Sequence, residues 1–271
     1  MDHHRAHPGA PRPRGHLPVA QAREGGSHVM NRTFAIAGRE FRASLSSPLG
    51  YVFMLLFVIV GLSLFFFVEG FFSSGEASTR GFFKWIPFLM LLVGPALTMR
   101  FWADERKTGT YEVLATLPLT ATQLVWGKFL AAFWMLGLAL LLTIGVPIVA
   151  SNYGELDWGP VVGGYTGALL LGSAYLAIGL VCSALVQEQL LALFLGWAVC
   201  GLTLLPDLAF WDSLFQNAQW LLELRSIGFA SRFDSIERGV LDLRDLLFYL
   251  SATGFFLYLN VALLRWRRFT T

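Results

Sequence analysis

Six stretches of this chain are long and apolar enough to cross a lipid bilayer, and they constrain the fold more than any other feature. They cover residues 48–72, 82–100, 123–149, 160–186, 190–207 and 245–264. A spanning helix needs about 20 mostly apolar residues. Only 14% of the residues are charged, against roughly 25% in a soluble domain, so a folded surface could not be covered with polar groups. We therefore predict an all-α integral membrane protein with six transmembrane helices.

The segment before the first span has two parts. Residues 1–29 are rich in Pro, Gly, His and Arg and lack the apolar core of a signal peptide. We expect disorder here, or an extension upstream of a true start at Met30, with a His-rich metal site as the alternative. Residues 31–45 place four apolar side chains on one helical face: Phe34, Ala37, Phe41 and Leu45. This pattern predicts an interfacial amphipathic helix, with a frayed terminus as the alternative.

Lys and Arg residues in the loops predict the orientation, because cytoplasmic loops carry an excess of both. If the N-terminus is cytoplasmic, ten of these residues fall on the cytoplasmic side: Arg32, Arg39, Arg42, Arg100, Arg106, Lys107, Lys128, Arg265, Arg267 and Arg268. Six fall on the other side: Arg80, Lys84, Arg225, Arg232, Arg238 and Arg244. We therefore expect both termini in the cytoplasm.

Individual residues predict how some spans begin, bend and pack. Ser47 and Pro48 form an N-cap followed by a first-position proline, and Pro95 should kink the second span. In the fourth span, small residues recur at helical spacing: Gly164, Ala168, Gly172, Gly179 and Ser183. Such a stripe lets helix backbones approach closely in lipid, either within the chain or across a dimer interface.

Residues 207–244, between the fifth and sixth spans, are too polar to cross a membrane but show helical periodicity. Leu214, Ala218, Leu221 and Leu222 share one face, and Phe233, Ile236, Val240 and Leu243 share another. We predict two short amphipathic helices that cap the outer mouth of the bundle. The alternative is a pair of interfacial helices with no gating role.

The sequence contains no catalytic or nucleotide-binding motif that we recognise. It lacks the G-x-x-x-x-G-K-[ST] loop that holds ATP phosphates. It also lacks paired acids at metal spacing, and the mid-membrane acid that a proton- or sodium-coupled carrier would use. Charges balance from Met30 onward, so no basic surface for nucleic acid remains. We expect no enzyme activity, metal or cofactor on this chain, and a transport role driven by another protein.

The charged stretch 101–122, between the second and third spans, is the exception in this apolar chain. Gly109 ends the run of charges, Thr110 can cap a short helix, and Pro118 ends that helix. Thr120 and Gln123 then have the spacing of a capping box for the third span. We predict a short, stiff helix that can transmit a push between two spans. An ordinary solvated loop is the alternative.

The segment "ERKTGTYEVLATLPLTATQLVWGK", residues 105–128, resembles the region between the second and third spans of ABC-2-type permeases, the membrane subunits of ABC transporters. The positions that match are Glu105, Gly109, Thr110, Glu112, Leu114, Pro118 and Lys128. The resemblance implies a cytoplasmic coupling helix that docks in a groove of the ATPase subunit. We expect Tyr111, Val113, Leu114 and Leu117 to supply most of the docking energy through buried apolar area, because exposed ion pairs contribute little.

A second segment, "SRFDSIERGVLDLRDLLFYLSATGFFLYLN" at residues 231–260, resembles the end of the gliding-motility-associated subgroup of these permeases. Its matching positions are Phe233, Arg238, Gly239, Asp242, Arg244 and Asp245. The resemblance implies that residues 30–271 form an ABC-2-type transmembrane domain in a bacterial cytoplasmic membrane. It implies an exporter permease paired with a second copy or a similar permease, with ATP and Mg²⁺ held by cytoplasmic ATPase subunits. Members of the subgroup also work alongside an auxiliary membrane-anchored protein.

Two other classes of function share some of these features. A membrane anchor or assembly subunit that recruits a cytoplasmic partner, without moving a substrate, would carry the same charged stretch. A stand-alone channel or carrier is disfavoured by the scarcity of ionisable groups inside the spans. The sequence does not indicate which substrate would be moved.

Overall fold

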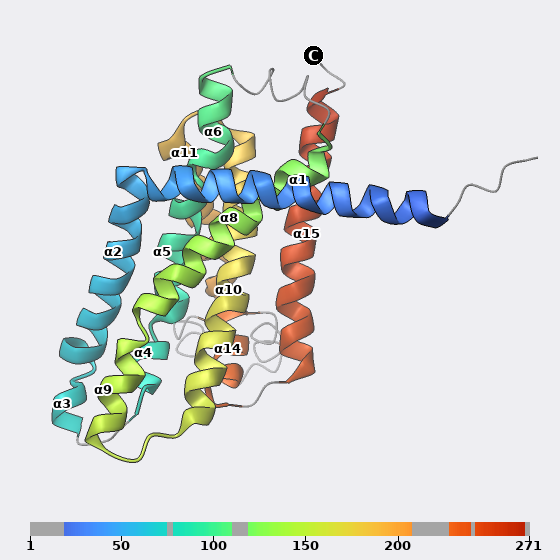
Figure 1. The fold of residues 1–271 in the computed structure, drawn as a ribbon. Coiled ribbons are helices and arrows are strands. Elements are labelled where there is room, and N and C mark those ends of the chain that lie inside the picture. Colours follow the sequence, from blue (N-terminus) through green and yellow to red (C-terminus); the bar gives the residue numbers. More distant parts are fainter. Residues whose placement is uncertain (1–18, 75–77, 110–118, 208–227, 240–241, 269–271) are drawn as a thin grey trace, which may run out of the picture.

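The structure is a computed structural model that describes residues 19–74, 78–109, 119–207, 228–239 and 242–268. All regular structure within these ranges is helical (Figure 1). Six helical segments are long and apolar enough to cross a membrane: Pro48–Ser73, Ile86–Lys107, Ala121–Tyr153, Trp158–Leu185, Gln189–Asp207 and Leu243–Trp266. The predicted fold class is therefore confirmed.

The described helices follow one another in the order in which the spans were predicted. They are α1 (Val19–Leu45), α2 (Pro48–Ser63), the π-helix η1 (Leu64–Val68), α3 (Phe71–Ser74), α4 (Arg80–Phe83), α5 (Ile86–Thr98), α6 (Arg100–Lys107), α8 (Ala121–Leu142), α9 (Gly145–Tyr153), α10 (Trp158–Leu185), α11 (Gln189–Leu204), the 3₁₀ turn η2 (Leu205–Asp207), α14 (Phe229–Glu237) and α15 (Leu243–Arg268).

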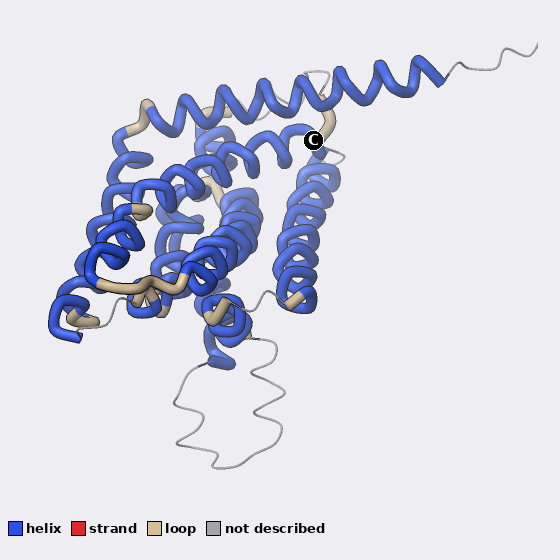
Figure 2. The backbone as a smooth tube through the Cα atoms, turned by 60° about the horizontal axis from the view of Figure 1, so that its bottom comes forward, coloured by secondary structure: helices blue, strands red, loops and turns tan. Residues whose placement is uncertain are grey.

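Helix α1 runs across the spans near one end of the bundle instead of along them (Figures 1 and 2). It packs on α8, where Ile36 and Ala37 are buried. Phe34 and Phe41 both contact the ring of Trp134, at centroid distances of 6.3 and 5.9 Å. This is the arrangement expected of an interfacial amphipathic helix.

The N-terminal boundary of α1 differs from the expectation of disorder over residues 1–29. The helix begins at Val19, and residues 1–18 lie outside the described part of the chain. Ala20, Ala22 and Arg23 are good helix formers, and adding turns to an existing helix costs far less than starting one. The helix therefore extends beyond the segment that packs on α8.

Three of the six spans are interrupted, and the interruptions follow local chemistry. The first span changes to a π-helix and then breaks at Gly70, which has a φ of +61°. The second is interrupted at Met99, four residues after the predicted kink at Pro95. In the third, Pro147 lacks the N–H that would bond to the Thr143 carbonyl, and Tyr165 of α10 donates its hydroxyl to that carbonyl at 2.9 Å.

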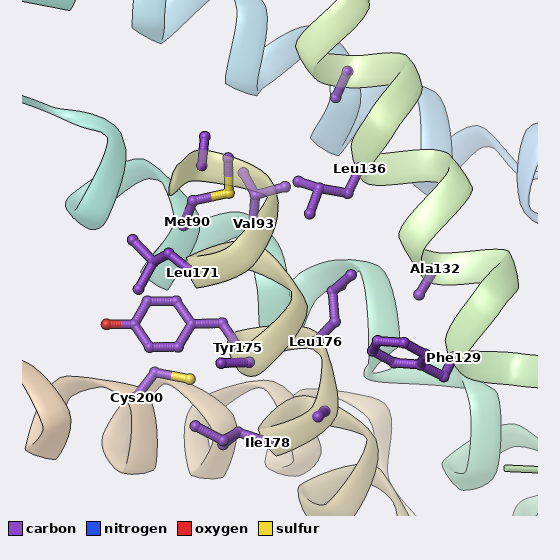
Figure 3. Packing of buried hydrophobic residues seen from close by; sticks show 14 of the residues in the cluster. Met90, Val93, Phe129, Ala132, Leu136, Leu171, Tyr175, Leu176, Ile178 and Cys200 are labelled. Carbon is purple, nitrogen blue, oxygen red and sulfur yellow. The ribbon is translucent and has the colours of Figure 1, made fainter. Parts of the chain in front are cut away.

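Helix α10, the fourth span, forms the centre of the bundle and contacts α5, α8, α11, α14 and α15. In the most apolar 18-residue stretch of this span, 83% of the residues are buried. The corresponding share is 22% in the first span and in the fifth. Figure 3 shows Leu171, Tyr175 and Leu176 of α10 packed among side chains from the neighbouring helices. The other spans are therefore arranged around one central helix.

The predicted stripe of small residues on α10 lies against other helices of the same chain. A Cβ at Gly164 would come within 2.6 Å of the Phe83 ring, and one at Gly172 within 3.1 Å of the Met90 sulfur. A Cβ at Gly179 would lie 2.9 Å from Pro95 Cα and overlap the Thr98 hydroxyl. Ala168 is fully buried. These positions allow α4, α5 and α8 to approach α10 closely.

The segment between the fifth and sixth spans is described only in part. Leu214, Ala218, Leu221 and Leu222 lie outside the described residues, as does Val240. Helix α14 buries Phe233 and Ile236 as predicted, but Leu243 is 65% exposed and belongs to α15. The expectation that Leu243 shares their face is wrong, because Gly239 adopts a φ of +84° and separates the two helices.

Candidate functional site

Lys128 lies about two turns into α8. Its side chain is almost fully buried, and its neighbours along the helix are mostly apolar. Its ammonium group donates to Glu105 Oε1 at 2.6 Å and to the Phe101 carbonyl at 2.9 Å. Glu40 Oε1 of α1 lies 3.7 Å away. The same nitrogen lies 4.8 Å from the centroid of the Trp102 ring. We call Lys128, Glu40 and Glu105 the Lys128 cluster.

A buried lysine is costly unless it is paired and hydrogen-bonded, because its charge loses the hydration of bulk water. The Lys128 ammonium group is surrounded by the two carboxylates of the cluster, by the Phe101 carbonyl and by the Trp102 ring. Its members come from three elements that are far apart in the sequence, namely α1, α6 and α8. The cluster therefore fixes the interfacial helix to the end of the second span and the beginning of the third.

Ser183 of α10 supports α6 at the point where the second span is interrupted. Its Oγ accepts hydrogen bonds from the backbone N–H groups of Trp102 and Ala103, at 3.1 and 3.2 Å. The same hydroxyl donates to the Met99 carbonyl at 2.8 Å. One side chain thus satisfies three backbone groups at the helix break.

The charged residues of α6 attach this helix to the turn between α10 and α11. Arg106 donates to the carbonyls of Ala184 and Val186, at 2.9 and 3.3 Å. Lys107 forms an ion pair with Glu188 at 3.1 Å. The run of charges at residues 104–107 thus makes contacts with α8 and with the α10–α11 turn.

Both ends of the predicted coupling segment are described. Gly109 adopts a φ of +72° directly after α6, which is the position where glycine commonly ends a helix. At the other end, Thr120 Oγ1 accepts from the Gln123 N–H at 3.2 Å, and Gln123 Oε1 accepts from the Thr120 N–H at 2.9 Å. The predicted capping box of the third span is confirmed.

The segment between these ends, residues 110–118, lies outside the described part of the chain. It contains seven residues assigned to ATPase coupling: Thr110, Tyr111, Glu112, Val113, Leu114, Leu117 and Pro118. The coupling helix therefore stays a prediction. Of the remaining positions, Glu105 and Lys128 form the ion pair above, and Gly109 ends α6.

Glu40 is the member of the cluster that sequence reasoning missed. It lies one helical turn from Ala37, and Ala37 was predicted to lie on the apolar face of α1. An acid beside the buried face of an amphipathic helix indicates a cationic partner on the element that covers it. That partner, Lys128, lies 88 positions further along the chain, so only the tertiary structure identifies it.

Residues 72–211 match the family described as ABC-2 family transporter protein. The chain belongs to the ABC-2 transporter family. No curated protein matches it. The matched range includes α6, the coupling segment, α8 and the central helix α10, so most of the site lies inside it.

The second group of predicted positions lies outside the matched range, at the opposite end of this ABC-2 protein (Figure 1). Phe233 is buried against Gly167 of α10, and Gly239 packs on the backbone of Gly159 and Pro160. Asp242 caps α15, since its Oδ1 accepts from the Arg244 N–H at 2.9 Å. These positions connect α14, α15 and the end of α10 that lies away from α1.

Asp245 and Arg238 have different surroundings within this second group. Asp245 is buried and accepts from Arg232 at 2.9 Å, and the guanidinium of Arg232 lies over the Phe248 ring at 4.3 Å. Arg238 is exposed at the edge of a groove between α4 and α14. We call this the outer groove; its charged residues are Glu69, Arg80, Lys84, Asp234, Glu237 and Arg238.

Two carboxyl groups of α14 in the outer groove of this ABC-2 protein, those of Asp234 and Glu237, have raised pKa values. Burial, and then the nearby charge of Asp234, raise the pKa of Glu237 to about 7, although Arg80, Arg238 and Lys84 oppose the shift. Burial also raises the pKa of Asp234 above its ordinary value. Glu237 therefore changes charge in the neutral pH range.

Proposed function

We propose that this ABC-2 protein is the permease subunit of an ABC exporter, and that residues 109–119 receive the motion of a separate ATPase. The observation that carries the proposal is the Lys128 cluster. It ties the residues just before the coupling segment to the start of the third span and to α1. A segment held firmly at both ends transmits displacement better than a loose loop. A push on it would move the second and third spans together.

The rest of the proposal follows the family and the loop charges. ATP and Mg²⁺ would bind to the partner ATPase, because the chain has no phosphate-binding loop. The end of the bundle with α1, α6 and both termini of the coupling segment would face the cytoplasm, as the excess of Lys and Arg predicts. The chain would sit in a bacterial cytoplasmic membrane, paired with a second copy or a similar permease.

The finer assignment to the gliding-motility-associated subgroup belongs to the same proposal. It rests on the resemblance at residues 231–260, which the described structure arranges around α14 and the start of α15. An auxiliary membrane-anchored protein would be a further partner. This partner would bind at the end of the bundle that contains α14.

The test is the ATPase activity of the permease reconstituted in vesicles with the ATPase that copurifies with it. Leu114→Pro, and charge reversal at Glu105 and Glu112, should abolish the stimulated activity and leave the chain in the membrane. Leu243→Pro is the matched control, because it places proline at the first position of α15, where proline is tolerated.

Full stimulated activity in Leu114→Pro would contradict the coupling role. An ATPase that binds but never responds to changes in the spans would favour the alternative, a membrane anchor that recruits a cytoplasmic partner.

A further inference from the structure

Figure 1 shows the corner where the interfacial helix α1 turns into the first span. Residues at this corner line a cavity. It has a volume of about 680 Å³, counted with its open mouth, and is enclosed by α1, α2, α5, α6 and α8. Leu49 lines the cavity and is itself exposed at the surface of the first span. The cavity therefore opens where a lipid-facing span meets a helix that lies along the membrane interface.

The wall of this cavity has an apolar part and a charged part. Leu49, Phe53, Leu97 and Met135 form the apolar part, from the first, second and third spans. The charged part contains Glu40, Arg100, Asp104, Glu105 and Lys128. A molecule that filled the cavity would need an apolar tail and a charged head.

The charged groups differ in how readily they could bind such a head. Lys128 is buried and already surrounded by Glu105, Glu40 and the Phe101 carbonyl, so it has little capacity for another partner. Arg100 and Asp104 pair at 3.2 Å with 38% and 31% of their side chains exposed. Arg100 also donates to the Ser47 hydroxyl. Both members of the pair are partly exposed, and ion pairs open to solvent contribute little, so Arg100 and Asp104 can exchange partners at little cost.

An arginine beside an aspartate fits a head that carries both signs of charge. The guanidinium fork matches a phosphate, and the released carboxylate can accept hydrogen bonds from an ammonium group. Asp104 would be held in place by Gln189, whose side-chain amide donates to it. A purely anionic head would satisfy Arg100 but would leave Asp104 and Glu40 facing a negative charge.

We propose that this cavity binds a phospholipid whose head carries a phosphate and a primary ammonium group. The phosphate lies on Arg100, the ammonium lies on Asp104 beside Glu40, and one acyl chain follows Leu49, Phe53 and Met135. The occupant is a lipid and not a soluble phosphate ester, because the apolar wall opens toward the surface of the first span. This site does not depend on the proposed coupling role, and it would be present in an anchor as well as in a permease.

The test is lipid titration of the purified full chain in detergent, read by native mass spectrometry. Dioleoyl-phosphatidylethanolamine should bind about tenfold more tightly than the phosphatidylglycerol with the same acyl chains, a factor that corresponds to about 1.4 kcal/mol. Glycerophosphoethanolamine, which has the same head without acyl chains, should not compete. Arg100→Gln should weaken phosphatidylethanolamine binding about tenfold, and Asp104→Asn should remove the preference over phosphatidylglycerol.

Two further variants keep the test decisive. Arg42→Gln removes an exposed cation of α1 that does not line the cavity, and it should bind lipid as the unmodified chain does. Arg100→Lys keeps the charge without the fork, and it should bind phosphatidylethanolamine more weakly than the unmodified chain even if Arg100→Gln does not fold. Equal binding of the two lipids, or binding that neither Arg100 variant weakens, would overturn the proposal.

Discussion

The Lys128 cluster and the outer groove lie at opposite ends of the bundle, and their charged side chains differ in burial. At the end with α1, the Lys128 cluster is buried and its lysine contacts partners from three elements. At the other end, the outer groove is lined by charges that are mostly exposed, such as Lys84, whose side chain is 65% exposed and pairs with Glu69. The same residue types therefore form a rigid connection in the Lys128 cluster and a loose one in the outer groove.

This difference indicates where the protein is built to stay fixed and where it can respond. Removing one partner from a buried ion pair leaves an uncompensated charge and is strongly destabilising, whereas an exposed pair contributes little. The Lys128 cluster therefore holds α1, α6 and α8 together, on both sides of the proposed coupling segment. The outer groove can change its charge with only a small effect on the fold.

Lys128→Met should produce the largest effect, because it removes the ammonium group that Glu105 binds in a largely buried site and leaves Glu40 paired with Arg39 alone. We expect the free energy of unfolding to fall by about 3–5 kcal/mol. Tryptophan fluorescence during titration of the purified protein with a denaturing detergent would measure this fall in the free energy of unfolding.

Lys84→Met is the matched control at the outer end, and its expected loss is below about 1 kcal/mol. Combining Lys128→Met with Glu40→Gln and Glu105→Gln should recover most of the lost stability, because no buried charge then remains. Equal losses of unfolding free energy in Lys128→Met and Lys84→Met would contradict the stated difference between the Lys128 cluster and the outer groove.

Ser183→Ala should have an intermediate effect. It leaves the N–H groups of Trp102 and Ala103 and the carbonyl of Met99 without the hydroxyl that joins them. Unsatisfied buried groups cost about 1–3 kcal/mol, and the same unfolding titration would detect this. Ser251→Ala, at an exposed position of α15, should change stability by less than about 0.5 kcal/mol; a similar loss in both variants would argue against a special role for Ser183.

The pH dependence at the outer groove should be the smallest effect. The pKa of Glu237 is about 7 in the folded chain, above its ordinary value of 4.5. A carboxyl group with a raised pKa stabilises the fold fully below the ordinary value, and this contribution is lost as the pH rises through the folded value. Relative to Glu237→Gln, the unmodified protein should therefore lose thermal stability between pH 4.5 and about 7.

Melting temperatures of the two proteins across this range would test the prediction. Glu155→Gln, at an exposed position, should run parallel to the unmodified chain. The groups that face Glu237 are Asp234 and Arg238 on its own side of the groove, and Arg80, Lys84 and Glu69 across it. A melting curve for Glu237→Gln with the same pH dependence as the unmodified protein would show that Glu237 does not titrate in this range.

The spans, the amphipathic face of α1 and the capping box at Thr120 could be predicted because each depends on residues close together in the sequence. The meeting of Glu40, Glu105 and Lys128 could not, because it depends on how three helices pack. The break at Thr143 has a local cause in the sequence, because Pro147 has no N–H to donate to the Thr143 carbonyl. The error at Leu243 arose because a continuous helical pattern does not reveal that Gly239 takes a left-handed conformation.

Cysteine cross-linking of the permease to its ATPase tests the central claim most directly. Cys182 and Cys200 are the two cysteines of the sequence and both are buried, so an introduced cysteine would be the principal reactive thiol. Glu112→Cys, in the coupling segment, should form a cross-linked product with the ATPase in reconstituted vesicles. Arg244→Cys, at the opposite end, should form none. An ATPase that cross-links to position 244, or never to position 112, would contradict the account.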